Sequence, residues 1–409
     1  MTTPSTQPQG GWLRVGVVTE TYPPEINGVA NTMRQLVEGL AARGHRLHLV
    51  RPRQPRGAGP SPSPNPTPEI EQTLVPGFPI PGYRGLRFGL PVFWRLRGLW
   101  RRRPVDVVYI ATQGPLGHAA LMAARLGGIP TVTGFHTQFH QYSRHYGLGL
   151  LTRPIARILR RFHNRSDVTL VPTPELEAQL AAQGFANLHL FGRGVDVRLF
   201  SPRRRDSRLR AAWGCGPADL VVLYVGRVAA EKNLDLAREA FEAIEAACPG
   251  SRFVVVGEGP ALAHLQRVYP RFVCTGSQVG EALAAHYASA DLFLFPSLTE
   301  TFGNVVPEAM ASALPVVAFD YAAAHTAIVS GVNGVTVAPN DSVGFVAAAV
   351  RIARDPERLR VMGAAARRAA EGMSWERVLD DVEERLLEVV RRRSIEGAHE
   401  TVAGAAERP

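Results

Sequence analysis

Residues that could bind an anion stand close together in the stretch GRVAAEKNLD, residues 226–235. It holds Arg227 and Lys232, and Lys232 is the only lysine in a chain that otherwise uses arginine for its basic residues. Both follow the apolar run LVVLYVG, which predicts that they leave the end of a buried strand. Arginine offers a planar fork of donors, and lysine a compact charge that fits between phosphate oxygens. We expect the pair to bind a diphosphate and stabilise a leaving group, unless it only caps surface loops.

Two glutamates eight residues apart flank a glycine in ETFGNVVPE, residues 300–308. Proline is tolerated only in the first turn of a helix, so Pro307 predicts a helix that begins near residue 306. Glu300 then lies in the preceding loop and Glu308 in the first turn. Gly303 leaves the backbone amides at this helix start accessible to an anion, and the two acids can accept hydrogen bonds from hydroxyls. A nucleotide sugar would use every part of this arrangement. The alternative is a solvated loop acid and a favourable first-turn charge.

Strand and helix patterns alternate along the chain in two series, which predicts parallel sheets covered by helices on both faces. The predicted strands are residues 13–20, 45–53, 105–112, 130–137, 168–174 and 187–196, then 219–226, 251–259, 271–276, 291–297 and 314–320. The fold class is therefore α/β, with two doubly wound, Rossmann-like domains at 1–200 and 201–393 and a flexible tail at 394–409. The cleft between the two sheets is the expected site.

Basic charge is concentrated in the first half of the chain. The net charge is +10; residues 1–200 hold 23 Arg against 10 acids, whereas residues 201–409 hold 23 basic against 26 acidic residues. Segments 84–104 and 153–165 carry seven and five Arg without an acid, interleaved with aromatic and aliphatic residues such as Trp94 and Trp100. This pattern favours an anionic membrane surface. Solvated helix faces are the alternative, and we expect no nucleic acid because no nucleic-acid-binding motif occurs.

Several classes of protein are disfavoured by what the sequence lacks. Three cysteines without a CxxC pair suit a reducing compartment and no structural metal. No apolar run is long enough to span a membrane, and no signal peptide is apparent. We therefore expect a cytoplasmic protein, associated peripherally with the inner face of the cell membrane. The stretch VVVGEGPALAHL fails the dinucleotide fingerprint because Leu262 stands at its third glycine position.

Four motifs in order, PPEINGV (23–29), GRGVDVRLF (192–200), GRVAAEKN and ETFGNVVPE, resemble the retaining GT-B glycosyltransferases of family 4. GFHTQFHQYSRHYG (134–147) is similar to the branch with bacterial α-mannosyltransferases and sulfoquinovosyl- or glucosyl-diacylglycerol synthases. The resemblance implies a GT-B fold and transfer of a mannose- or glucose-type hexose from a GDP- or UDP-linked sugar to a membrane lipid or lipid-linked acceptor. It also implies that base contacts lie near residues 277–279. It leaves the donor base, the sugar, the acceptor and the oligomeric state open.

The resemblance also assigns roles to single residues. Gly28 matches the glycine that lets the donor approach the N-terminal domain, and His136 the histidine that contacts the transferred sugar. Arg227 and Lys232 match the diphosphate pair. Glu300 matches the acid that holds the sugar hydroxyls. The backbone amides that would accompany it are those of Phe302, Gly303, Asn304 and Val305. Glu308 matches the acid on the ribose, and Asp196 is a family residue without an assigned role.

The absence of a DxD pair from the sequence predicts a reaction without a metal, in which Arg227, Lys232 and the helix start take the metal's electrostatic role. For this family the resemblance implies same-face attack by the acceptor hydroxyl rather than a double displacement. The rival hypotheses are an inverting GT-B enzyme, a GT-B nucleotide-sugar epimerase, and a non-catalytic basic protein that binds membrane or nucleic acid. Release of nucleotide that depends on a lipid acceptor would separate transfer from the epimerase and from the non-catalytic protein.

Overall fold

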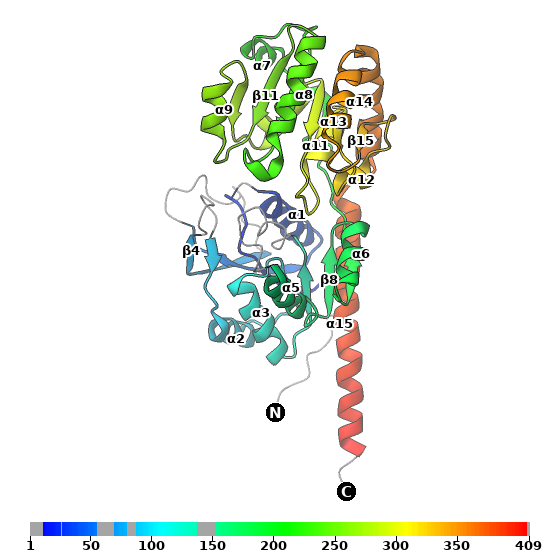
Figure 1. Cartoon of the computed structure of the whole chain (residues 1–409). Coiled ribbons are helices and arrows are strands. Elements are labelled where there is room, and N and C mark those ends of the chain that lie inside the picture. Colours follow the sequence, from blue (N-terminus) through cyan, green and yellow to red (C-terminus); the bar gives the residue numbers. More distant parts are fainter. Residues whose placement is uncertain (1–10, 26, 55–68, 80–86, 137–151, 407–409) are drawn as a thin grey trace. The chain divides into compact units, whose positions relative to one another are not determined.

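The computed structural model describes residues 11–25, 27–54, 69–79, 87–136 and 152–406, and its described residues form two compact units. The first comprises residues up to 136, 152–192 and 378 onwards, and the second comprises residues 193–377. Each unit is a parallel sheet with helices packed on it (Figure 1). The expected α/β class with two such units is confirmed.

The first sheet has seven parallel strands in the order β3-β2-β1-β6-β7-β8-β9. Its strands are β1 Arg14–Val18, β2 Arg46–Pro52, β3 Ile70–Val75, β6 Val107–Ile110, β7 Thr131–Gly134, β8 Val168–Val171 and β9 Leu188–Leu190. The central strands β1, β6, β7 and β8 are almost entirely buried, because apolar β-branched runs need cover on both faces of a parallel sheet. β3, which forms one edge, was not expected from the sequence.

The helices of the first unit follow the strands as predicted. They are α1 Gly28–Ala42, α2 Phe93–Arg102, α3 Pro115–Leu126, α5 Thr152–His163 and α6 Pro174–Ala182. Sequence signals explain their starts: the side chain of Asn27 accepts a hydrogen bond from the amide of Ala30, and Pro115 and Pro174 occupy first-turn positions. A short antiparallel hairpin, β4 Gly77–Pro79 with β5 Arg87–Gly89, precedes α2.

The second sheet has six parallel strands in the order β12-β11-β10-β13-β14-β15. They are β10 Val221–Val225, β11 Arg252–Val256, β12 Val273–Gly276, β13 Leu292–Phe295, β14 Val316–Phe319 and β15 Val335–Val337. Alternate residues of β10 enter opposite cores: Val221 and Leu223 pack into one cluster, and Val222 and Tyr224 pack into the other. The helices on this sheet are α7 Ser207–Ala212, α8 Leu234–Ala247, α9 Leu262–Val268, α10 Gly280–Ser289, α11 Val305–Ala311, α12 Ala323–Ala327, α13 Ser342–Ala353 and α14 Pro356–Glu371.

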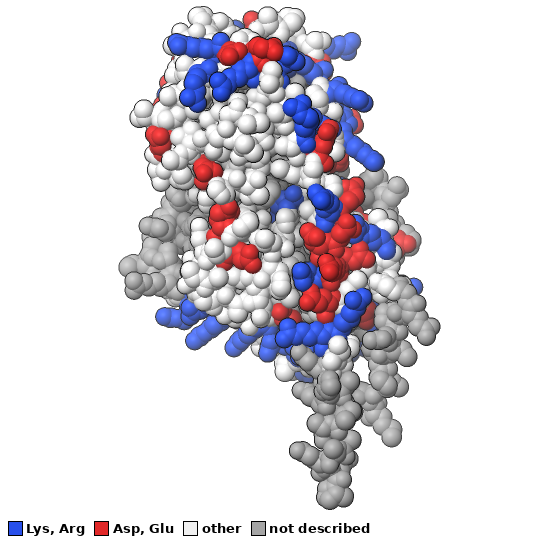
Figure 2. All heavy atoms as spheres, turned by 90° about the vertical axis from the view of Figure 1, so that its right-hand side faces the viewer, with Lys and Arg blue, Asp and Glu red and all other residues white. Residues whose placement is uncertain are grey.

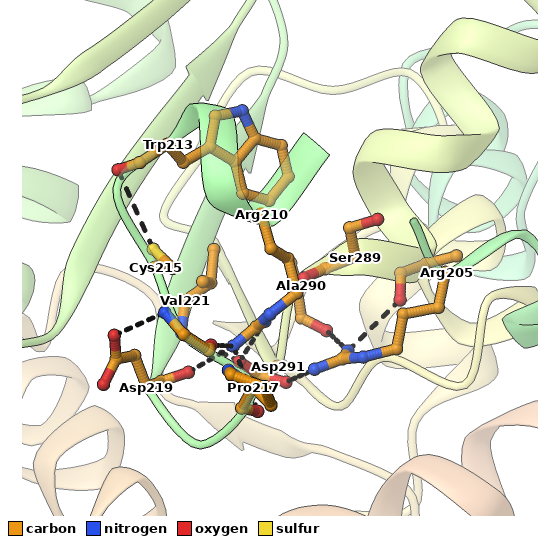
Figure 3. Close-up of polar contacts among 12 residues, drawn as sticks. Arg205, Arg210, Trp213, Cys215, Pro217, Asp219, Val221, Ser289, Ala290 and Asp291 are labelled. Carbon is orange, nitrogen blue, oxygen red and sulfur yellow. Dashed lines mark hydrogen bonds and ion pairs between the residues drawn. The ribbon is translucent and has the colours of Figure 1, made fainter. Parts of the chain in front are cut away.

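Asp291 aligns the two strands that carry the candidate site (Figure 3). One carboxylate oxygen accepts hydrogen bonds from the amide of Val221, at 2.9 Å, and from Arg210 Nη1, at 3.0 Å. The other oxygen pairs with Arg205 Nη2 at 2.8 Å. The starts of β10 and β13 are therefore tied to the segment that enters the second unit, and their carboxyl ends lie side by side at the opposite edge.

The last helix, α15 Trp375–Ala406, belongs mainly to the first unit, which differs from the expected domain limits. Arg43 pairs with Asp380 at 2.7 Å and with Glu383 at 2.8 Å, and Arg393 pairs with Asp167 at 2.9 Å. In Figure 1 this helix runs beside β8 and α6. Residues 394–406 are helical, and the flexibility expected of residues 394–409 stays a prediction.

Candidate active site

The candidate residues of the second unit gather where its strand order reverses. β10 and β13 are neighbours in the sheet although β11 and β12 come between them in the chain, because β11 and β12 lie on the other side of β10. The helices that follow β10 and β13 pack into different cores on opposite faces of the sheet, and in such folds ligands bind at the carboxyl ends of the strands beside the reversal. Lys232 follows β10 and Glu300 follows β13, so both stand at this reversal.

Lys232 and Glu300 form an ion pair at this position. The ammonium Nζ contacts Glu300 Oε1, and the two side chains are only 13% and 14% exposed. Ser297 Oγ donates to the same carboxylate oxygen at 2.8 Å, and the hydroxyl of Tyr321 donates to the carbonyl of Glu300 at 2.7 Å. Lys232 therefore does not extend into bulk solvent: it is held at the strand reversal beside the acid that was predicted to bind sugar hydroxyls.

Arg227 lies in the same loop and is paired with a neighbouring acid. Its Nη1 is 2.7 Å from Glu231 Oε1, and the carbonyl of Glu231 accepts a hydrogen bond from Thr299 Oγ1 at 2.9 Å. The side chain of Arg227 is partly exposed, whereas that of Glu231 is buried. Thr299 thus joins the loop after β10 to the loop after β13. Glu231 was not singled out in the sequence, although its spacing of four from Arg227 was a signal.

The helix after Glu300 begins at Val305, as Pro307 predicted. Gly303 has φ +97°, a backbone conformation that side chains other than glycine rarely adopt, and this explains glycine at the turn. Glu308 lies in the first turn and accepts a hydrogen bond from the hydroxyl of Tyr287 at 3.0 Å. Burial disfavours the charged carboxylate and raises the pKa of Glu308 to about 7, despite the hydrogen bond from Tyr287, which lowers it.

Two further candidates lie in the first unit, at the carboxyl edge of its own sheet. Gly28 is exposed at the start of α1, after β1. His136 is buried just after β7, and its Nε2 is 2.7 Å from the hydroxyl of Tyr109, a fully buried residue of β6. A Cβ at position 134 would lie 2.3 Å from His136 Nε2 and 2.5 Å from the Tyr109 hydroxyl, so Gly134 leaves room for this contact. Thr137, the next residue of the motif, is outside the described residues.

Comparisons with known proteins agree with this arrangement. The family model described as Glycosyltransferase Family 4 matches residues 26–224, and the model described as Glycosyl transferases group 1 matches residues 219–355. A GDP-mannose-dependent alpha-mannosyltransferase of Mycolicibacterium smegmatis is 35% identical over 94% of this chain and 100% of its own length. The chain belongs to glycosyltransferase family 4. An alpha-monoglucosyldiacylglycerol synthase of Acholeplasma laidlawii is 28% identical over 85% of this chain and 90% of its own.

A comparison with solved structures shows the fold. A sucrose-phosphate synthase from Thermosynechococcus elongatus superposes with a TM-score of 0.74, at 18% identity, over 93% of this chain and 99% of that one. The predicted GT-B fold of this glycosyltransferase is therefore confirmed. The structure places Arg227, Lys232 and Glu300 on the loops after β10 and β13 and Glu308 in the first turn of α11, all in the second unit, whereas Gly28 and His136 belong to the first unit.

Glu20 is a buried acid of this glycosyltransferase that the sequence analysis missed. It follows β1, where the order of the first sheet reverses, and its Oε1 accepts a hydrogen bond from the amide of Leu116 at 3.1 Å, at the start of α3. Burial raises the pKa of Glu20 to about 7. A Cβ at Gly114 would lie 1.9 Å from its carboxylate, so the acid fills the space at that helix start. An acid directly after an apolar strand was the available signal.

Asp196, the family residue without an assigned role, has a structural one. Its Oδ1 accepts hydrogen bonds from the amides of Arg198, at 3.0 Å, and Leu199, at 2.9 Å. It caps a turn within GRGVDVRLF, near the start of the second unit. Among the described residues no group of three or more His, Cys, Asp or Glu could hold a metal ion, and none of their helices is both long and apolar enough to cross a bilayer.

Proposed function

We propose that this glycosyltransferase transfers a mannose- or glucose-type hexose from a nucleotide-diphosphate sugar to a membrane lipid or lipid-linked acceptor, with retention and without a metal. The observation that carries the proposal is the contact between Lys232 and Glu300 at the strand reversal, with Glu308 in the helix that follows. In a nucleotide sugar the hexose and the diphosphate are joined directly. A cation for the phosphate and an acid for the sugar hydroxyls must therefore also be neighbours, as these two are.

The proposed reaction needs little beyond electrostatic stabilisation. The bond from the anomeric carbon to the diphosphate oxygen breaks, and the acceptor oxygen forms a new bond to that carbon on the same face. The acceptor proton passes to the departing diphosphate, so the products are a glycoside and a nucleoside diphosphate. Arg227 and Lys232 stabilise the developing negative charge, an effect worth about 2.7–4 kcal/mol for each donor in comparable sites. His136 contacts the transferred sugar, and Glu308 accepts hydrogen bonds from the ribose.

A lipid acceptor fits the surface of the first unit. Helices α2, α3 and α5 share one core through Leu96, Trp100 and Phe162, and each exposes apolar side chains elsewhere. Trp94 is 77% exposed, and Ile158 is 54% exposed. Exposed arginines accompany them on α2 and α5, and each basic residue near an anionic surface contributes about 1 kcal/mol of attraction.

The structure corrects one part of the membrane hypothesis. Trp100 was expected to reach the membrane together with Trp94, but it is only 4% exposed and packs in the core under α2. Leu96 is fully buried on the same side of the helix, four residues earlier. Trp94 is therefore the tryptophan of α2 that a membrane could contact.

The face covered by α6 and α15 is unsuited to an anionic membrane. Figure 2 shows acidic side chains gathered on this face and basic ones along the lower margin, at the height of α2 and α3 in Figure 1. A hollow on the acidic face is lined by Glu177, His189, Leu190, Asp381, Glu384 and Arg385. Its three acids would repel both a lipid phosphate and a nucleotide, so we assign membrane contact to α2, α3 and α5.

The test is a donor panel with the purified full chain. GDP-mannose, GDP-glucose, UDP-glucose and UDP-glucuronate would each be incubated with and without diacylglycerol-containing vesicles, and released nucleotide would be measured. Release from one donor that rises with the lipid acceptor supports the proposal. If the chain bound vesicles but neither bound nor cleaved any donor, it would be a membrane-binding module. If nucleotide were released at the same rate with and without the lipid acceptor, the activity would be that of an epimerase or hydrolase.

A further inference from the structure

A second hollow of the first unit is lined by arginines. It encloses about 480 Å³, within the usual size of ligand sites. Its described lining residues are Arg53, Gln54, Leu74, Pro76, Gly77, Arg87 and Arg95. Three separate elements supply the arginines: Arg53 follows β2, Arg87 begins β5, and Arg95 lies on α2. No acid is among these lining residues.

The arginines of this hollow are not neutralised by their surroundings. Within the described part of the chain, neither Arg53 nor Arg95 takes part in an ion pair. Residues 53–105 contain nine Arg and only two acids, and one of these, Glu71, is paired with Arg103. The segments 55–68 and 80–86 add Arg56 and Arg84 to the sequence here but no Asp or Glu. Basic residues therefore outnumber acids by nine to two in this part of the sequence.

Arg87 supplies a second, independent observation. One of its terminal nitrogens donates to the carbonyl of Gly77 across the hairpin, which holds the guanidinium in place. Its Nε is buried and has no hydrogen-bond partner among the described residues. Leaving a buried charged donor unsatisfied costs free energy, so such a donor indicates a missing acceptor. A phosphate or carboxylate group would provide one, and guanidinium groups bind both in bidentate geometry.

Exposed apolar residues adjoin the hollow. Phe78 packs against Phe88 across the hairpin at a ring-centroid distance of 5.6 Å and is 42% exposed. Leu90, after the hairpin, is 40% exposed, and Trp94 precedes Arg95 on α2. A free inorganic anion would not use these residues. A lipid would, because its acyl chains lie beside its charged headgroup.

We propose that Arg53, Arg87 and Arg95 form a binding site for the anionic headgroup, phosphate or carboxylate, of a membrane lipid. This proposal rests on the proposed lipid-directed function and deepens it. The site takes one headgroup in a fixed position, whereas the exposed arginines elsewhere on α2 and α5 attract anionic lipid without selecting an orientation. A lipid bound here is anchored to the same unit that carries Gly28 and His136.

The test uses the full chain and a short-chain lipid that stays monomeric. Binding of dihexanoylphosphatidylglycerol would be measured by calorimetry, beside dihexanoylphosphatidylcholine and inorganic phosphate. We expect Arg53→Met, Arg87→Met and Arg95→Met each to weaken phosphatidylglycerol binding about tenfold or more, the usual loss for one charged hydrogen-bond donor. Arg101→Met is the matched control: it removes the same charge from the same helix, is exposed and does not line the hollow, and should stay within about twofold of wild type.

Three outcomes would overturn the proposal. If Arg101→Met lost as much phosphatidylglycerol affinity as the variants of the hollow, the lipid would be attracted by the general positive charge of the surface and not bound at a defined site. Equal affinity for the two lipids would mean that the anionic group is not recognised, and phosphate binding as tight as phosphatidylglycerol would mean an anion site without a lipid. Arg95→Met changes an exposed side chain and keeps the test valid if Arg87→Met fails to fold. GDP and UDP binding, measured by thermal shift, should be unchanged in all variants, so failure of the donor assay and failure of this site are distinguishable.

Discussion

Replacing Lys232 with methionine tests the role of the candidate diphosphate pair. The change removes the ammonium from a pair whose side chains are 13% and 14% exposed and leaves Glu300 with the hydroxyl of Ser297. Breaking a buried ion pair costs about 3–5 kcal/mol, and the residual exposure and the Ser297 hydrogen bond bring our expectation to about 2–3 kcal/mol of unfolding free energy. Loss of one donor to the leaving diphosphate costs a further 2.7–4 kcal/mol at the transition state, or about 100- to 1000-fold in turnover.

The assay is steady-state release of nucleotide from the donor that the wild-type chain uses, together with urea unfolding. Arg238→Met is the matched control, because Arg238 also forms an ion pair in the second unit, with Glu242 at 2.5 Å on α8, but lies outside the candidate loops. It should retain turnover within about threefold, as expected for an ion pair near the surface. Lys232→Arg should not restore full activity, because a guanidinium is larger and more rigid than the ammonium it replaces. If Lys232→Met turned over as fast as Arg238→Met, the reasoning would be refuted.

Four further predictions concern the rest of the site and the surface. Because burial raises the pKa of Glu308 to about 7, the acid is protonated below that pH, and donor affinity should fall by up to about tenfold per pH unit there; Glu308→Gln should flatten this dependence in a titration of KM. Trp94→Ser should weaken binding to phosphatidylglycerol vesicles without altering unfolding, whereas Trp100→Ser should lower the free energy of unfolding by about 3–5 kcal/mol. Tyr109→Phe should lower turnover more than donor affinity by releasing His136, and equal effects on both would contradict that role. Excess EDTA should leave the initial rate unchanged, and a loss restored by Mg²⁺ would refute the metal-independent mechanism.

Much of the fold could be predicted because local sequence determines it. Apolar runs bounded by glycine and proline marked the central strands of both sheets, since a strand buried on both faces must be apolar at every position. Pro307 fixed the start of α11 to within one residue for a steric reason. The edge strands β3 and β15 were not predicted because they are less buried than the central strands, so their sequences lack a continuous apolar run, and β15 has only three residues.

The partners of the site residues could not be read from the sequence. Lys232 and Glu300 lie 68 positions apart in the chain. They meet because β10 and β13, the strands that precede them, are neighbours in the sheet. Tyr109 stands in an apolar strand, and nothing in its immediate neighbours indicates that its hydroxyl meets His136. Such contacts depend on strand order, which is a property of the whole unit.

Trp94 and Trp100 show a signal that was present but not used. Leu96 and Trp100 are four residues apart, so they share a helix face, and both are buried. Trp94 points elsewhere and is exposed. Counting aromatic residues in a basic segment overestimates its membrane contact unless the helical period is applied first. The packing of α15 on the first unit is a different case: amphipathic spacing indicates that a helix packs, but not on which unit.

The most direct test of the central claim is transfer of labelled sugar from a nucleotide donor into lipid. The purified chain would be incubated with GDP-[¹⁴C]mannose or UDP-[¹⁴C]glucose and vesicles containing candidate acceptors, followed by organic extraction and assignment of the anomer by NMR. We predict label in the lipid phase with the α-configuration of the donor, and its loss in Lys232→Met. Label that appears only as free sugar, or as a β-linked product, would contradict the account.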